Sequence, residues 1–166
     1  MNAHNEWLRF ADSNFEIAKN VVKSSEIRYE DLCNQLQQAV EKALKALLVF
    51  YGEDPPKTHN LYLLLHEVEK YENIPDSMID VIFLNDHAVL TRYPGNYTEL
   101  KQEDFENSLT IAEMCLSWVR GIIKTNNQNK PHNEKPPPFF LCFLMRRNPH
   151  SPRSKRKSGK RACLGN

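Results

Sequence analysis

The sequence has little glycine and no long apolar stretch. Five glycines in 166 residues, with no internal repeat, argue against a turn-rich all-β chain, a collagen-like chain and a solenoid. The longest apolar run, residues 139–145, is far shorter than the roughly 20 residues that a membrane span needs. The first residues lack the basic and apolar regions of a secretory signal. We therefore expect a cytoplasmic protein without a membrane segment, whose four scattered cysteines, lacking a C-x-x-C pair, are free thiols.

Charge and proline content divide the chain near residue 130. Residues 131–166 contain nine basic residues, one acidic residue and six of the ten prolines, so their formal charge is +8, whereas residues 1–130 carry −7. This composition predicts a globular domain over residues 1–130 and a disordered, basic tail over residues 131–166. The alternative for the tail is an arm that binds nucleic acid or another polyanion through nonspecific contacts.

Apolar residues recur three and four positions apart through most of residues 1–130. The spacing predicts helices over about residues 4–23, 29–51 and 60–71, a fourth that begins at Pro75 and ends before Pro94, and a fifth that follows a polar loop at residues 96–102. Gly52 stands where the glycine that ends a helix belongs. No segment alternates at period two. The predicted fold is an all-α, up-and-down bundle of four to five helices, with the short third helix as an accessory.

Three of these helices carry more apolar surface than one interior accepts easily. In the first helix, a stripe that includes Leu8, Ala11 and Phe15 runs beside a second stripe of Trp7, Phe10, Ile17 and Val21. The helices over residues 29–51 and 105–123 also carry adjacent stripes. We therefore expect residues 1–130 to form a symmetric dimer.

Charged side chains cluster in the middle of the second predicted helix. Gln38, Glu41, Lys42 and Lys45 share one side of it. Composition favours a solvated face with an ion pair between Glu41 and Lys45. The alternative is a polar groove in which Lys42 or Lys45 meets a phosphate or an acidic partner.

Two further segments contain candidate binding residues. Before the third helix, Thr58 or Asn60 can cap the helix, whose first amides could receive an anion, and His59 is a ligand, a proton carrier or a packed loop histidine. At the end of the fourth helix, Arg92 either pairs with the helix dipole or presents a planar fork to phosphate, with Tyr93 as a stacking face. We expect His59, Arg92 and Tyr93, with Lys42 or Lys45, to line one cleft that binds a nucleotide or an acidic loop.

Sequence motifs for common cofactors are missing. There is no Walker loop, G-x-G-x-x-G, G-x-S-x-G or H-E-x-x-H motif. His59 and His66 lack a third ligand at metal spacing. We therefore expect neither a metal nor a cofactor.

Four segments together resemble the HEPN domain, a nucleotide-binding domain of higher eukaryotes and prokaryotes. The resemblance covers about residues 4–125, and it is carried in order by residues 7–11 (WLRFA), 37–48 (QQAVEKALKALL), 56–61 (PKTHNL) and 91–94 (TRYP). It implies a four- or five-helix bundle, often dimeric. It also implies action beside a minimal nucleotidyltransferase, in a toxin–antitoxin pair or as a fused domain.

One departure from the family concerns catalysis. Ribonuclease members carry an arginine followed after four to six residues by a histidine, but no histidine follows Arg92 at that spacing. The absence favours a non-catalytic module that binds a nucleotide or a partner. A ribonuclease toxin with a displaced pair, such as His59 with Arg92, is the second interpretation, and RNA is then a ligand. A purely structural dimerisation domain is the third.

Overall fold

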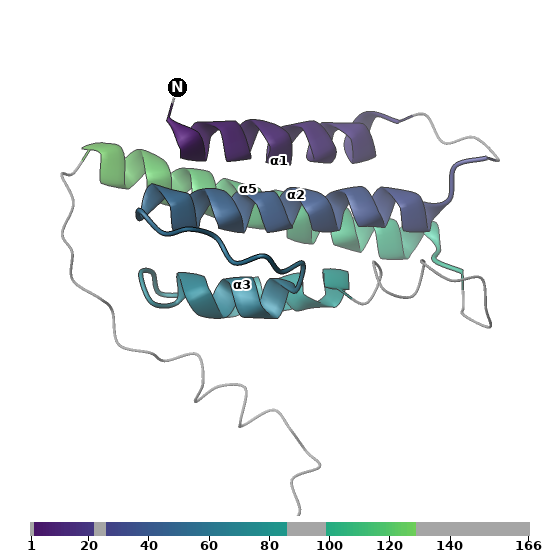
Figure 1. Ribbon diagram of the computed structural model, residues 1–166. Coiled ribbons are helices and arrows are strands. Elements are labelled where there is room, and N and C mark those ends of the chain that lie inside the picture. The colour runs from purple at the N-terminus through teal and green to yellow at the C-terminus, as the bar shows by residue number, and fades with distance from the viewer. Residues whose placement is uncertain (1, 22–25, 86–98, 129–166) are drawn as a thin grey trace, which may run out of the picture.

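The computed structural model describes residues 2–21, 26–85 and 99–128, and these residues form helices and connecting loops (Figure 1). The elements are α1 (Ala3–Asn20), α2 (Tyr29–Phe50), α3 (Leu61–Val68), the 3-10 helix η1 (Asp76–Ile82) and α5 (Gln102–Gln128). The prediction of an all-α bundle is confirmed. The basic tail lies outside the described residues.

Helix α2 is the centre of the bundle. It packs against α1, α5 and α3, and in Figure 1 it runs alongside α1 and α5, with α3 on its other side. A helix surrounded in this way is apolar on most of its circumference. The interior contains fully buried side chains from every element, among them Ala11, Leu36, Val40, Leu44, Leu47, Leu64, Val81, Ala112 and Val119.

The ends of α2 follow the signals in the sequence. The helix begins at Tyr29 and ends at Phe50, within one residue of the prediction. Gly52 has a φ of 84°, a left-handed conformation that glycine adopts without a steric penalty. The amide of Glu53 then donates to the carbonyl of Leu48 at 3.0 Å, which satisfies a carbonyl of the last turn. The expected glycine stop is confirmed.

The fourth helix differs from the prediction in type. Asp76–Ile82 forms a 3-10 helix, and residues 83–85 continue in α conformation. Pro75 is not the first helical residue but flanks the element in extended conformation, and its carbonyl accepts a hydrogen bond from the amide of Met78 at 2.9 Å. Asp, Ser, Ile and Val are weak α-helix formers, and they dominate this segment. The predicted continuation to Val89 lies outside the described residues.

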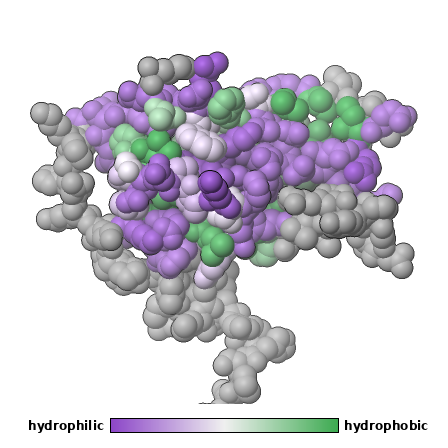
Figure 2. Space-filling model, viewed as in Figure 1, coloured by the Kyte–Doolittle hydropathy of each residue, from purple (hydrophilic) through white to green (hydrophobic). Residues whose placement is uncertain are grey.

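Helix α1 buries only one of its two apolar stripes. Ala11, Phe15 and Ala18 are buried against α2 and α5, whereas Phe10 is 53% exposed and Ile17 48% exposed. Apolar surface is visible on the α1 side of the molecule in Figure 2. The exposed stripe is a surface that a second copy of the chain can cover.

Hydrogen bonds between tyrosines and carboxylates close one end of the bundle. The Tyr51 hydroxyl donates to Glu72, and Asn126 Nδ2 donates to the Tyr51 oxygen at 3.0 Å and to Glu72 Oε1 at 3.2 Å. The Tyr51 and Tyr71 rings stack with centroids 5.0 Å apart. Since Tyr51 follows α2, Glu72 follows α3 and Asn126 lies in α5, the cluster joins three elements.

We expect the stability of the domain to fall above pH 10. Burial, followed by the hydrogen bond to Glu72, raises the pKa of Tyr51 well above its ordinary value of 10. The folded state therefore holds this proton when the unfolded chain has lost it, so the contribution of Tyr51 to stability is complete below pH 10 and decreases as the pH rises further. Urea denaturation at pH 9 and pH 11 measures the decrease. Tyr51→Phe, which costs roughly 1 kcal/mol through its lost hydrogen bonds, should show a smaller decrease; an equal one would contradict this assignment.

We expect the tail to be dispensable for folding. The described core is formed by residues between Ala11 and Ile123, and the proline and charge content of residues 131–166 leaves that segment little regular structure to contribute to a core. A chain truncated after Lys130 should therefore melt at the midpoint of the full chain in calorimetry. A decrease of many degrees would show instead that residues 139–145 pack against the bundle.

Candidate functional site

A buried ion pair lies in the middle of α2. Lys45 Nζ is 2.8 Å from Glu41 Oε1, and the two side chains are only 9% and 5% exposed. The spacing of Glu41 and Lys45 predicts this pair, but on a solvated face. That placement is wrong, because Gln37, Glu41 and Lys45 are all buried.

His59 joins the same carboxylate from the loop that precedes α3. Its Nδ1 lies 3.0 Å from Glu41 Oε2 and 3.2 Å from Oε1. Gln37 Nε2 donates to the backbone carbonyl of His59 at 3.0 Å and lies 3.4 Å from Glu41 Oε2. The residue is therefore held through its ring and through its backbone.

The His59 side chain is 70% exposed, although its partner carboxylate is buried. A carboxylate beside Nδ1 favours the tautomer that carries the proton there, as an N–H donor to the carboxylate. Nε2 is then a base when the ring is neutral and a second donor when it is protonated. Glu41 already neutralises the buried Lys45, so His59 is the exposed group of this network that can contact a ligand. Lys45 acts on His59 only through Glu41, the carboxylate that both side chains contact.

The two candidate lysines have different surroundings. Lys45 Nζ lies 5.7 Å from the centroid of the Trp7 ring in α1, an additional favourable contact for the buried ammonium. Lys42 is half-buried, and it donates to Asn14 Oδ1 on α1. The structure thus brings Lys45 and His59 together through Glu41, and it engages Lys42 with α1.

The first amides of α3 are already occupied. Asn60 caps the helix, accepting hydrogen bonds from the amides of Tyr62 and Leu63, and Asn85 Oδ1 accepts from the amide of Leu61 at 3.0 Å. The cap is one of the two predicted. The amides are not available to an anion, because side-chain oxygens fill their positions.

Arg92 and Tyr93 lie outside the described residues. Asn85, which immediately precedes the segment containing them, also approaches the start of α3, with its Nδ2 3.3 Å from Asn60 Oδ1. Asn85, the last described residue before Arg92, therefore lies beside Asn60, the residue that follows His59.

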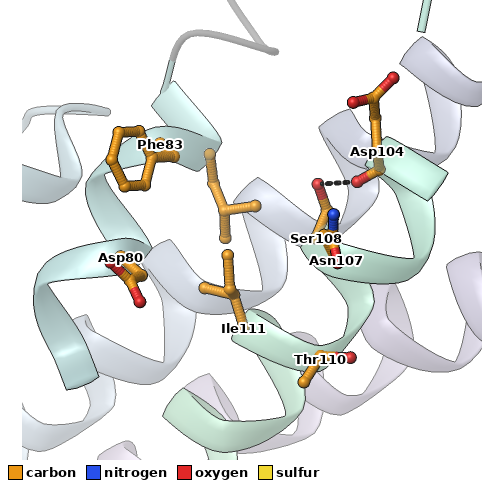
Figure 3. Close-up of a pocket in the computed structure, with 8 residues that line it drawn as sticks. Asp80, Phe83, Asp104, Asn107, Ser108, Thr110 and Ile111 are labelled. Atoms are coloured by element: carbon orange, nitrogen blue, oxygen red, sulfur yellow. Dashed lines mark hydrogen bonds between the residues drawn. The ribbon is translucent and has the colours of Figure 1, made fainter. Parts of the chain in front are cut away.

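A pocket of about 490 Å³ lies between η1 and α5 (Figure 3). Asp80 and Phe83 line it from one side, and Asn107, Thr110 and Ile111 line it from α5. Ser108 Oγ donates to the carbonyl of Asp104 at 2.7 Å. No pattern in the sequence indicates this pocket, since its walls come from two distant segments.

The described residues contain no group of three His, Cys, Asp or Glu side chains placed to hold a metal ion. Among the same residues, no helix is long and apolar enough to span a membrane. Cys33 and Cys115 are buried free thiols, as expected; burial raises their pKa to about 11 and about 12. Cys142 and Cys163 lie outside the described residues.

Residues 4–122 match the sequence model of the HEPN domain. A curated relative, "Putative toxin MJ1304" of Methanocaldococcus jannaschii, is 26% identical over 133 residues, which cover 71% of this chain and 86% of that protein. Two solved structures have similar folds. TT1696 from Thermus thermophilus has a TM-score of 0.65 at 25% identity and covers 73% of this chain and 98% of that one. ST0689, described as an archaeal HEPN homologue, has a TM-score of 0.57 at 28% identity and covers 74% and 99%.

Proposed function

The chain belongs to the HEPN domain family, and from this we propose that it is a nucleotide- or partner-binding module of a toxin–antitoxin-like pair. Its partner in this proposal is a minimal nucleotidyltransferase, and its site of action is the cytoplasm. The toxin name of the Methanocaldococcus relative supports the assignment to such a pair.

The observation that carries the proposal is the exposed His59 ring on the buried Glu41–Lys45 pair. A buried ion pair seldom stabilises a protein more than apolar residues of the same size. The stability of the fold alone therefore does not explain why α2, the most buried helix of the bundle, contains Glu41 and Lys45. Their arrangement does fix an imidazole at the surface, and a protonated imidazole can donate from Nε2 to a phosphate oxygen.

The position of Asn85 supports a shared site for His59 and Arg92. Arg92 follows Asn85 by seven residues, and an extended chain spans at most about 3.6 Å per residue. Asn85 is hydrogen-bonded at the start of α3, so a segment of seven residues is long enough to bring Arg92 to His59. We therefore include Arg92 and Tyr93 in the proposed ligand-binding set, with Lys45 behind His59 and Lys42 at the α1 side.

Thermal melting with and without adenine and guanine nucleotides tests the binding role. A ligand of the folded state raises the melting midpoint, and His59→Ala should abolish the increase. His66→Ala is the matched control, because His66 Nδ1 also lies near a buried carboxylate, Glu69 Oε2 at 3.4 Å. If neither nucleotides nor an added nucleotidyltransferase raised the midpoint, a purely structural dimerisation domain would be the better assignment.

The geometry of His59 also favours a second candidate, a metal-independent ribonuclease. A histidine whose Nδ1 faces a carboxylate has the orientation of a general base, with Nε2 available for the proton of an attacking 2′-hydroxyl. Degradation of RNA by the purified chain, lost in both His59→Ala and Arg92→Ala, would establish this activity. Degradation that survives both changes would assign it to a contaminant or to other residues.

We expect residues 1–130 to be a symmetric dimer in solution. Phe10, Ile17 and Val21 of α1 are exposed, and apolar surface of this kind is commonly covered by a second subunit. Light scattering should give twice the monomer mass, and replacing Phe10 and Ile17 with Asp should give monomers. A monomer at every concentration of the parent chain would rule the dimer out.

A further inference from the structure

A second pocket lies near the C-terminal end of α5. Its volume is about 350 Å³, and its walls are Trp118, Gly121, Ile122, Thr125 and Asn126 of α5 together with Glu72. It shares no residue with the network around Glu41. A pocket of this size accommodates a small molecule or one long side chain.

The Glu72 carboxylate in this pocket is held in place by neutral partners. The Tyr51 hydroxyl and Asn126 Nδ2 both approach Oε1. Among the described residues Glu72 has no ion pair, whereas the buried carboxylates of Glu41 and Glu69 lie beside Lys45 and His66. A half-buried, oriented carboxylate without a cation is a site where an external cation gains a charge-assisted hydrogen bond.

The other walls favour a cation that carries an apolar stem. Trp118 supplies an indole, the aromatic group that attracts cations most strongly. Ile122 adds aliphatic surface, and Thr125 adds a hydroxyl at the rim. An inorganic cation has no apolar part to pack against the indole and the aliphatic surface. An alkylammonium or alkylguanidinium group can contact the carboxylate with its charged end and the indole and the aliphatic surface with its stem.

Gly121 is an independent indication that this space is kept open. It lies within the 27-residue helix α5, where glycine is less stable than alanine. Its φ is not positive, and a Cβ at this position meets nothing within 4 Å. Neither backbone conformation nor packing therefore requires glycine here, but a side chain at residue 121 would project at the wall of the pocket.

We propose that the pocket formed by Glu72, Trp118 and Gly121 binds an alkylguanidinium or alkylammonium group, with the charged end at Glu72 and the stem against Trp118 and Ile122. Such a group is carried by a free amine metabolite or by an arginine or lysine side chain of a partner protein. The chemistry of recognition is the same in both cases. The pocket shares no residue with the proposed nucleotide site, so a result that contradicts one proposal does not contradict the other.

Titration of the full chain with butylguanidinium, followed by NMR, tests the site. The indole N–H resonance of Trp118, assigned with the help of a Trp7→Phe variant, should shift to saturation, while that of Trp7 should not move. The neutral analogue 1-pentanol should bind at least about tenfold more weakly, which is the scale of one charge-assisted hydrogen bond. A peptide with a single arginine, acetyl-Gly-Arg-Gly-amide, distinguishes the sources: binding of both probes indicates a partner side chain, and binding of butylguanidinium alone indicates a small molecule.

Three variants separate binding from folding. Glu72→Gln keeps acceptors for Tyr51 and Asn126 but removes the charge, so the affinity should fall at least about tenfold. Gly121→Ala should lower the affinity while raising the melting midpoint, because alanine favours the helix. The control is Glu103→Gln, since Glu103 is an exposed acid on α5, the helix that contains Gly121. This change should alter neither the affinity nor the melting midpoint. Unsaturable shifts, or an unchanged affinity in Glu72→Gln, would overturn the proposal.

Discussion

Replacing Glu41 with Ala is expected to destabilise the domain by about 3–5 kcal/mol, because the substitution leaves the buried ammonium of Lys45 without its carboxylate. The Lys45 side chain is only 9% exposed, so water cannot replace the lost partner without opening the bundle. His59 loses its ring contact as well. Urea denaturation, with the slope compared between variants, measures the change.

A matched pair on the surface provides the control for this prediction. Lys70 and Glu67 are also close along one stretch of chain, but their side chains are 43% and 37% exposed. Glu67→Ala should therefore cost less than about 1 kcal/mol. The double substitution Glu41→Leu with Lys45→Met should recover most of the stability, because an apolar pair removes both buried charges. If Glu41→Ala cost no more than Glu67→Ala, the ion pair would be solvated in solution and the proposed support for His59 would be wrong.

Replacing Arg92 with Lys is expected to weaken the binding of a nucleotide or partner by about 1–3 kcal/mol while leaving helicity intact. A guanidinium holds a phosphate through two parallel hydrogen bonds, and an ammonium cannot reproduce that geometry. The loss corresponds to roughly 5- to 150-fold in dissociation constant. Calorimetric titration with adenine and guanine nucleotides, or with the partner protein, measures it.

The control for Arg92 is an arginine with a structural contact. Arg120 of α5 pairs with Asp12 of α1, so Arg120→Lys should leave binding unchanged. If Arg92→Lys bound the ligand like the parent chain but had a much lower melting midpoint, Arg92 would be identified as a helix cap. In that case His59 and Arg92 would not share a site.

Local patterns in the sequence determined the class of fold, both ends of α2 and the start of α3, whereas α1 and α3 end three residues before the predicted positions 23 and 71. The three- and four-residue spacing of apolar side chains predicted α1, α2 and α5, because a helix needs one apolar face wherever it packs. Gly52 and Asn60 predicted an end and a start, since both act on backbone groups within a few residues. These signals act along the chain, so they can be read before any tertiary contact is known.

The tertiary structure decided which faces are buried and which side chains meet. Glu41 and Lys45 lie four residues apart on one helix, a spacing that is equally typical of a solvated pair. They are buried because α2 packs against α1, α3 and α5: the loop before α3 brings His59 onto Glu41, and Trp7 of α1 lies beside Lys45. Periodicity does not encode these contacts. Likewise, the pocket at Glu72 requires the end of α3 to meet the end of α5. Helical periodicity determines which residues share a face, but the burial of that face depends on segments distant in the sequence, and only their packing fixes it.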